Sequence, residues 1–331
     1  MIIHLNKEVT QKQAEDLAVK YQSILLNNGK LTLVTTSKLK VADDALKAVA
    51  DEIFVTDTDI QLASKQYLKT KRQVNLGGVT IGGSTHNTIA ITGPCSVESE
   101  EQIESAAKLC VELGVKVLRA GAFKPRTSPY TFQGLGLEGL KLLAKMRDKY
   151  GLQIITEVRD STHADDVIEY ADIIQIGAKS MYDHGILRKC GASKKPVLLK
   201  RGFGTTLQEF VQAAEFILSG GNPNVILCER GIRTFETKTR FTLDLCGVAW
   251  LKEYTNLPVI LDPSHAIGYA YGVPDLSRAC VAMGIDGLLI ESHPNPKVAM
   301  SDADQQLNFD EFRALHSSLQ KVAEAVGYSI V

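Results

Sequence analysis

Long apolar runs, a secretory leader and a strong net charge are all missing from this 331-residue sequence. No apolar run approaches the roughly 20 residues that a membrane-spanning helix needs, which argues against a membrane protein. The first residues lack the basic start and apolar core of a signal peptide, so we expect a cytoplasmic protein. The formal net charge of −1 argues against nucleic-acid binding, which normally requires a marked basic excess.

Paired cysteines are missing as well. The six cysteines are scattered and form no CxxC pair, so we expect reduced thiols rather than a disulfide framework. Most of them should be small core residues. Cys95 is the exception, because it follows a strand candidate within the segment Gly93-Pro94-Cys95-Ser96.

From residue 88 onward, short β-rich runs alternate with helical segments. The predicted strands are residues 89–91, 115–118, 152–155, 172–176, 196–199, 225–227, 258–261 and 287–290. The predicted helices are residues 100–113, 138–149, 161–170, 180–189, 206–219, 238–254, 275–283 and 309–326. Eight such units predict an α/β fold of the (β/α)8 TIM-barrel type. A doubly wound open sheet is the competing fold, but eight evenly spaced units without a signal for reversed strand order favour a closed barrel.

The first 72 residues differ from the rest and predict a small N-terminal α/β domain. Its strand candidates are residues 1–5, 30–36 and 52–56, and its helix candidates are residues 11–26 and 43–50. The second domain, residues 73–331, is predicted to be the catalytic barrel. It starts with a hairpin over residues 73–81, since Gly77-Gly78 lies in the middle of that run.

Chemistry in such barrels gathers at the C-terminal ends of the strands. Every predicted strand ends in groups that bind anions or metals or move protons: Cys95; Arg119 with Lys124 and Arg126; Glu157; Gln175 and Lys179; Lys200 and Arg201; Glu229 and Arg230; Asp262 and His265; Glu291 and His293. Random surface polarity would also place bulky apolar residues there. A shared functional site therefore explains the set better, although any single member could be structural.

The set separates into two kinds of chemistry. Arg119, Lys124, Lys179, Lys200 and Arg230 supply five cations from four strands, enough to hold one ligand with both phosphate and carboxylate groups. Arg126 and Thr127 lie further along the same loop and could hold a second phosphate. A thiolate, an imidazole and two carboxylates form a mixed ligand set for a divalent metal such as Mn, Fe, Co or Zn: Cys95, His265, Glu291 and Asp302.

Several motifs resemble the signature blocks of 3-deoxy-D-arabino-heptulosonate 7-phosphate (DAHP) synthases of the shorter bacterial type I branch. The match covers roughly residues 73–331, and its blocks follow the family's order and spacing: Gly93-Pro94-Cys95-Ser96, Lys124-Pro125-Arg126-Thr127-Ser128, Lys200-Arg201-Gly202, Glu229-Arg230-Gly231, Asp262-Pro263-Ser264-His265 and Glu291-Ser292-His293-Pro294. The sister enzyme, 3-deoxy-D-manno-octulosonate 8-phosphate synthase, typically has Lys-Ala-Asn-Arg-Ser at the second block. The resemblance therefore favours the heptulosonate enzyme.

The resemblance implies a metal-dependent condensation of phosphoenolpyruvate with erythrose 4-phosphate, the first step of the shikimate pathway of aromatic amino acid biosynthesis. It assigns the metal to Cys95, His265, Glu291 and Asp302, and phosphoenolpyruvate to Arg119, Lys124, Lys179, Lys200 and Arg230. It assigns erythrose 4-phosphate to Pro125, Arg126, Thr127 and Asp262. Lys124, His265 and Glu157 are the candidate catalytic residues for the proton transfers, and the sequence does not choose among them.

The resemblance also implies a homo-oligomer, commonly a tetramer, and an N-terminal domain related to the ferredoxin-like extension of some members. That extension mediates inhibition by an aromatic amino acid, here tyrosine or phenylalanine. The hairpin expected in such a domain is hard to find between residues 31 and 43. Three other functions stay open: the octulosonate synthase, a phosphosugar aldolase with a Schiff-base lysine at Lys179 or Lys200, and a non-catalytic sensor.

Overall fold

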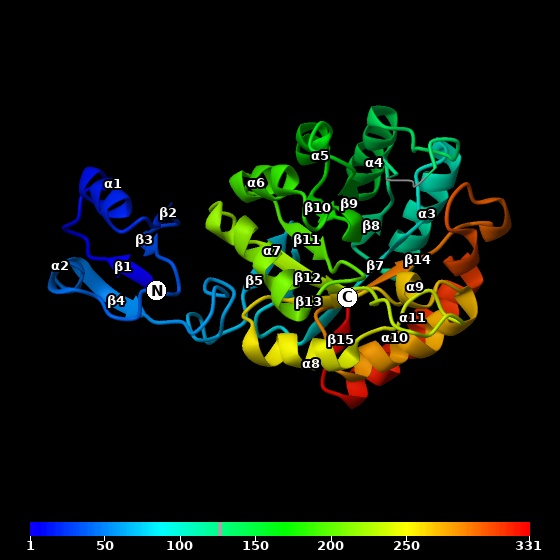
Figure 1. Ribbon diagram of the computed structural model, residues 1–331. Helices are drawn as coiled ribbons and strands as arrows, with labels where there is room; N and C mark the ends of the chain where they lie inside the picture. Colours follow the sequence, from blue (N-terminus) through cyan, green and yellow to red (C-terminus); the bar gives the residue numbers. More distant parts are fainter. Residues whose placement is uncertain (125–127) are drawn as a thin grey trace.

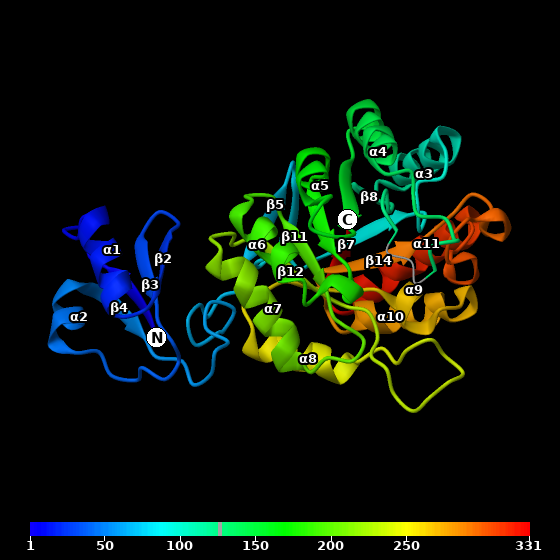
Figure 2. The same cartoon turned by 45° about the horizontal axis from the view of Figure 1, so that its top comes forward.

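The computed structural model describes residues 1–124 and 128–331. A small antiparallel sheet at the N-terminus lies beside a parallel barrel surrounded by helices (Figure 1). Figure 2, turned by 45°, shows the same separation, with the intervening segment running from the small sheet to the barrel.

The small sheet has the βαββαβ order of a ferredoxin-like unit. Its elements are β1 (Ile2–Leu5), α1 (Gln11–Lys20), β2 (Ile24–Asn27), β3 (Leu31–Val34), α2 (Asp44–Val49) and β4 (Ala50–Phe54). The strands are antiparallel in the order β2-β3-β1-β4. Apolar side chains on one face of the sheet pack on the two helices and form a small core of their own, whereas Ile2, Leu26 and Val34 belong to the same buried cluster as the barrel.

The predicted helix over residues 11–26 was too long. A capping box between Thr10 and Gln13 starts α1, but the helix ends at Lys20 and Gln22 has a φ of +48°. The apolar residues that follow extend the helical spacing in sequence but form β2 instead. Asn28-Gly29, with a φ of +85° at the glycine, is a strong hairpin signal and turns β2 into β3. The hairpin that seemed missing is therefore Ile24–Val34.

The barrel prediction is confirmed. Its strands are β7 (Asn87–Gly93), β8 (Val117–Arg119), β9 (Gln153–Val158), β10 (Ile173–Ile176), β11 (Val197–Lys200), β12 (Val225–Glu229), β13 (Val259–Leu261) and β14 (Gly287–Glu291). Each pairs in parallel with the next, and β14 pairs with β7 to close the barrel. A short C-terminal strand, β15 (Ser329–Ile330), adds to β7.

Helices follow the strands and cover the outside of the barrel. The longer ones are α3 (Glu100–Leu113), α4 (Leu137–Tyr150), α5 (Ala164–Tyr170), α6 (His184–Ala192), α7 (Leu207–Ser219), α8 (Leu245–Tyr254), α10 (Val273–Ala282) and α11 (Phe309–Ala325). Shorter ones are η1 (Ala178–Ser180), α9 (Pro263–Ile267), η2 (Ala270–Gly272), η3 (Pro296–Val298) and η4 (Ala303–Gln305). None of the helices in the described part of the chain is long and apolar enough to cross a membrane.

One predicted barrel helix, residues 238–254, starts too early. Asp244 caps α8 by accepting from the backbone N–H of Gly247, so the helix begins at Leu245. Residues 231–243 instead form a loop, in which Ile232 and Thr242 exchange backbone hydrogen bonds. This loop, called the β12–α8 loop below, supplies side chains to the barrel mouth.

The N-terminal end of the barrel is closed by the predicted hairpin, β5 (Gln73–Leu76) and β6 (Val79–Gly82). Its apolar side chains join the inward-facing residues of the barrel strands in one buried cluster: Val74, Leu76, Ile81, Ile89, Ile91, Val117, Ile155, Ile173, Leu198, Ile226, Cys228, Ile260 and Leu289. The interior is thus a packed core, and access is left to the C-terminal ends of the strands.

The segment after β4 contacts both the small sheet, through Gln61 Oε1, which accepts from the Met1 amino group at 2.6 Å, and the barrel. The Glu215 carboxylate on α7 accepts the backbone N–H groups of Gln61, Leu62 and Ala63 at 2.8, 3.1 and 2.7 Å. Further along, Arg72 donates from Nε to Asn256 at 2.9 Å. These bonds attach residues 61–72 to the barrel, and the domain boundary at residue 72 stays a prediction.

Candidate active site

The C-terminal ends of the strands surround a cavity of about 580 Å³. Its lining contains the cations of several βα loops together with two aromatic rings: Lys124, Lys179, Lys200, Phe203, Arg230, Arg233, Arg240 and Phe241. Glu157, His265 and Asp302 line the same cavity. An excess of positive charge around one cavity favours a small ligand with several negative charges.

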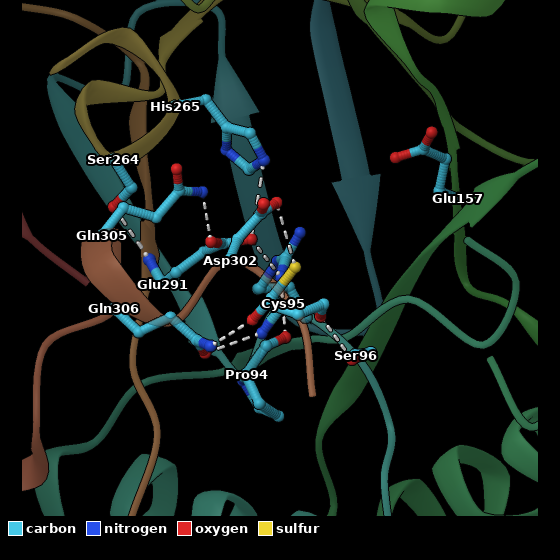
Figure 3. Close-up of polar contacts among 12 residues, drawn as sticks. Pro94, Cys95, Ser96, Glu157, Ser264, His265, Glu291, Asp302, Gln305 and Gln306 are labelled. Atoms are coloured by element: carbon cyan, nitrogen blue, oxygen red, sulfur yellow. Dashed lines mark hydrogen bonds and ion pairs between the residues drawn. The ribbon is translucent and has the colours of Figure 1, made fainter. Parts of the chain in front are cut away.

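Three of the four predicted metal ligands converge beside this cavity (Figure 3). The ligand atoms of Cys95, Glu291 and Asp302 all lie within 4.8 Å of one another, and Cys95 Sγ is 3.5 Å from Asp302 Oδ2. His265 lies on the cavity side of this cluster, with Nε2 at 3.6 Å from Glu291 Oε1. Its other nitrogen, Nδ1, is 2.8 Å from Asp262 Oδ2.

The cluster has the charge and the kinds of donor atom that a divalent cation requires. Burial opposes ionisation of Glu291 and Asp302, but His265 and nearby arginines outweigh it, lowering the pKa of Glu291 and bringing that of Asp302 to about 2. Burial, with help from Glu291, raises the pKa of the Cys95 thiol to about 12. Glu291 Oε1 is buried without a hydrogen bond from any described residue. The residues therefore fit a thiophilic divalent ion.

Two predicted phosphoenolpyruvate ligands lie against this cluster. Lys124 Nζ donates to Cys95 Sγ at 3.0 Å and to the Cys95 carbonyl oxygen at 3.1 Å. Burial disfavours its charge, but Cys95, Glu157 and Glu291 outweigh burial and raise the pKa of the ammonium group. Arg119 is absent from the described cavity lining: its Nη1 lies 2.8 Å from Glu291 Oε1 and donates to the Pro94 carbonyl at 2.6 Å.

Asp262 lies beneath the cavity and joins two predicted site residues. Lys200 Nζ donates to Asp262 Oδ2 at 2.6 Å, and both side chains are buried. Burial alone would raise the pKa of Asp262, but His265 and Lys200 hold it well below its usual range. Burial lowers the pKa of His265. Asp262 therefore orients a cation and a histidine at the cavity floor.

Four residues of the cavity lining, on two loops, were not predicted from the sequence: Phe203, Arg233, Arg240 and Phe241. Arg230 lies over the ring of Phe241 at 4.5 Å, and Arg233 lies over the ring of Phe203 at 4.8 Å. The two rings stack on each other with centroids 5.5 Å apart. Arg230, which was predicted, has a buried Nη1 without a partner in the described chain. Such stacked guanidiniums keep their N–H groups available for an anion.

Arg240 is the fourth missed residue. It lines the cavity from the β12–α8 loop and lies with Nη1 3.8 Å from Asp302 Oδ1. Both Arg233 and Arg240 follow β12 in sequence, so the rule that identified cations after other strands applies to them too. For Arg240, the helix predicted from residue 238 hid that signal.

The remaining predicted residues divide into three groups. Glu157 accepts a hydrogen bond from Gln175 Nε2 at 2.8 Å and faces the cavity with Lys179. Arg201 and Glu229, noted at strand ends, pair with each other at 3.0 Å. Arg201 also pairs with the Asp244 carboxylate, and Glu229 accepts the backbone N–H of Asp244, so these residues form a structural network. Pro125, Arg126 and Thr127, predicted to bind erythrose 4-phosphate, lie outside the described residues.

A barrel with one cation-rich cavity beside a thiol-and-carboxylate cluster defines an enzyme that acts on small, multiply charged anions. Residues 59–327 match the DAHP synthetase I family, and the chain belongs to that family. This confirms the resemblance seen in the signature blocks.

Relatives of known function agree with this assignment. Phospho-2-dehydro-3-deoxyheptonate aldolase of Thermotoga maritima is 47% identical over 270 residues, which cover 82% of this chain and 79% of that protein. The 2-dehydro-3-deoxyphosphooctonate aldolase of Bordetella petrii is more distant, at 33% identity over 261 residues, or 72% of this chain and 91% of the relative.

Solved structures agree as well. The crystal structure of the Thermotoga maritima phospho-2-dehydro-3-deoxyheptonate aldolase (DAHP synthase) superposes with a TM-score of 0.81 at 39% identity, covering 100% of this chain and 99% of that chain. A truncated form of the 3-deoxy-D-arabino-heptulosonate 7-phosphate synthase from the same organism reaches a TM-score of 0.76 at 43% identity. It covers 82% of this chain and 98% of that one.

Proposed function

We propose that this chain condenses phosphoenolpyruvate with erythrose 4-phosphate to give DAHP and inorganic phosphate, with the help of a divalent metal. The observation that carries the proposal is the single cavity in which cations from several loops adjoin the Cys95, Glu291 and Asp302 cluster. Membership of the DAHP synthetase I family supports the same reaction.

Phosphoenolpyruvate would bind among the cavity cations, since its phosphate and carboxylate both favour guanidinium and ammonium groups. Lys124, Lys179, Lys200 and Arg230 line the cavity as this assignment requires, and we add Arg233 to the set. Arg119 stays in the proposal because its Nε is buried without a partner among the described residues. Much of the rate gain would come from holding C3 of the enol against the aldehyde.

Erythrose 4-phosphate would enter from the loop that follows Lys124. Pro125, Arg126 and Thr127 stay predicted ligands of its phosphate, and the neighbouring Ser128 and Thr131 line the cavity. Asp262 would act from beneath, because it holds Lys200 and His265 in place.

Cys95, His265, Glu291 and Asp302 would hold the divalent cation, whose chemistry when bound is that of a Lewis acid toward an aldehyde oxygen. We assign the proton at that oxygen to Lys124, since its raised pKa keeps it charged near neutral pH. A bond then forms between C3 of the enol and the aldehyde carbon, and the aldehyde oxygen becomes a hydroxyl.

Water then adds to C2, and we assign Glu157 as the acceptor of its proton, because its carboxylate faces the cavity. The resulting hemiketal phosphate collapses: the C2–O bond to phosphate breaks, the ketone forms and the hydroxyl proton passes to the departing phosphate. Glu157 returns its proton to Lys124 through solvent, which restores both groups.

Two further features are proposed from the family resemblance. We propose a homo-oligomer, with a tetramer as the first expectation. We also propose that residues 1–72 bind an aromatic amino acid that inhibits the enzyme, since their ferredoxin-like order fits the extension present in some members.

Phosphate release with different aldose phosphates tests the reaction. We expect release from phosphoenolpyruvate with erythrose 4-phosphate, at least ten times faster than with the five-carbon arabinose 5-phosphate, and loss of activity with a chelator. A preference for the five-carbon sugar would instead assign the octulosonate reaction, which the Bordetella petrii relative makes the second candidate. Borohydride trapping of a lysine adduct would indicate a Schiff-base aldolase.

A further inference from the structure

The segment 301–307 touches every member of the Cys95, Glu291 and Asp302 cluster. It carries Asp302, whose φ of +43° is in the left-handed region, and continues through Gln305 and Gln306. Both glutamine side chains are buried, each in a residue 1% exposed. A buried amide must have both of its ends paired, so their partners define what these residues do.

Gln305 connects the cluster to the cavity. Its Nε2 donates to Glu291 Oε2 at 2.6 Å, and its Oε1 accepts from Arg240 Nη1 at 2.7 Å (Figure 3 shows the first bond). A guanidinium has only donors and a carboxylate only acceptors. The two neighbours therefore determine the orientation of the amide, with its NH2 group toward Glu291.

This bond leaves the two oxygens of Glu291 in different states. Oε2 is taken by Gln305, whereas Oε1 is buried without a hydrogen bond from the described chain. Oε1 is instead the oxygen that forms an ion pair with Arg119 Nη1, at 2.8 Å, and lies 3.6 Å from His265 Nε2. Gln305 thus determines which oxygen faces the other predicted ligands.

Gln306 acts on the opposite side of the cluster. Its Oε1 accepts the backbone N–H of Cys95 at 2.9 Å, and its Nε2 donates to the Ser301 carbonyl at 2.9 Å. The hydroxyls of Ser96 and Ser301 are 2.6 Å apart and strengthen the same junction. The Cys95 backbone is therefore held directly to the segment that carries Asp302.

We propose that Gln305 and Gln306 are positioning residues for the metal: Gln305 reserves Oε1 of Glu291 for the cation, and Gln306 holds the Cys95 thiol at the right distance from Asp302. The proposal rests on the proposed metal dependence. Residues that orient ligands in this way typically change metal affinity by about 10- to 100-fold when they are replaced.

Cobalt titration of the metal-free, full-length chain tests this role. Co²⁺ reports ligand number through its visible d–d bands and thiolate binding through a near-ultraviolet charge-transfer band. We expect Gln305→Met to bind Co²⁺ about 10- to 100-fold more weakly, because the Glu291 carboxylate loses the bond that orients it. We also expect altered d–d bands, because both Glu291 oxygens become available to the ion. We expect Gln306→Met to weaken binding similarly and to alter the charge-transfer band.

Gln175→Met is the matched control. Gln175 is buried and donates to a cavity carboxylate, Glu157, at 2.8 Å, but it does not contact the cluster. Its replacement should leave Co²⁺ affinity and spectrum unchanged. If Gln305→Met lowers the melting temperature of the metal-free chain, Gln305→Glu carries the test, since it keeps an acceptor for Arg240 but replaces the donor toward Glu291 with a second carboxylate; altered d–d bands are expected.

The outcomes separate the two levels of the proposal. Wild-type affinity and spectra in the Gln305 and Gln306 variants would overturn the positioning role while leaving the metal site intact. A wild-type chain that binds no Co²⁺ with a thiolate band would overturn the metal site, and the positioning role with it.

Discussion

At the scale of single residues, the position of a cavity carboxylate depends on a glycine next to it. Gly177 lies directly after β10, and a Cβ atom there would be 2.1 Å from Glu157 Oε1. Its φ of −69° is ordinary for any residue. A glycine is therefore needed here because a side chain would collide with Glu157, and not because of the backbone conformation. Replacing it changes the position of Glu157 without straining the backbone.

Gly177→Ala should displace the Glu157 carboxylate without disturbing the backbone. We expect kcat for phosphate release to fall about ten-fold or more, with a change in melting temperature of only a few degrees. Gly204→Ala is the control, since a Cβ at Gly204 meets nothing within 4 Å. Unchanged kcat in Gly177→Ala would remove Glu157 from the proposed chemistry.

Cys95 gives a second residue-scale prediction. Cys95→Ala should abolish bound metal and metal-dependent turnover while the fold remains, because it removes the one thiol of the cluster. Metal content after dialysis and phosphate release measure the two effects. Cys110→Ala, an equally buried thiol on α3, should keep its metal. Normal turnover of Cys95→Ala in the presence of a chelator would contradict the metal role.

At the scale of elements, α7 holds the segment that leads from the small sheet to the barrel. Three backbone N–H groups converge on the Glu215 carboxylate. Burial raises the pKa of this carboxyl to about 7, and the three N–H groups only partly oppose it. A carboxyl with a pKa above its unfolded value stabilises the fold at low pH and loses that contribution as pH rises through the folded pKa.

Glu215→Gln should therefore change how stability depends on pH. Between about pH 4.5 and 7 the wild-type chain should lose on the order of 2–3 kcal/mol that the non-titrating glutamine keeps. The melting temperature of the variant relative to wild type should thus rise from pH 5 to pH 8. Thermal unfolding at both pH values measures this, and a difference that stays constant with pH would contradict it.

At the scale of the whole molecule, the boundary between the two parts can be tested by truncation. A chain that starts at residue 56 keeps the bonds of residues 61–63 with Glu215 and of Arg72 with Asn256. We expect it to fold, to release phosphate and to lose inhibition by an aromatic amino acid.

Starting the chain at residue 73 is the matched comparison. This truncation removes those bonds and uncovers the surface under Leu62 and Ala63, both buried. We expect a melting temperature several degrees below that of the shorter deletion. Inhibition that persists in the chain starting at residue 56 would contradict the regulatory role of the small domain.

The overall architecture was predictable from sequence because it depends on local patterns. Alternating apolar runs and helices identified all the barrel strands, and the predicted ligand set of Cys95, His265, Glu291 and Asp302 contains the three residues of the cluster. The hairpin Ile24–Val34 was missed because its apolar residues also fit the spacing of the preceding helix.

Contacts between distant segments were not predictable in the same way. Gln305 reads as an ordinary polar residue until the fold places it 2.6 Å from Glu291 and 2.7 Å from Arg240, a residue 65 positions away. Likewise, the stacking of Phe203 on Phe241 joins two loops whose approach no local pattern encodes.

The pairing of β7 with β14 has a consequence for how the molecule is made. Bonded residues of these two strands, such as Thr92 and Ile290, are 198 residues apart in the sequence. The ribosome must therefore synthesise nearly the whole barrel before β7 can pair with β14. Until then the nascent sheet has two open edges, which invite aggregation. The thiol at the end of β7 also stays open to oxidants during that interval, so chaperones and reductants should matter most while the ring is still incomplete.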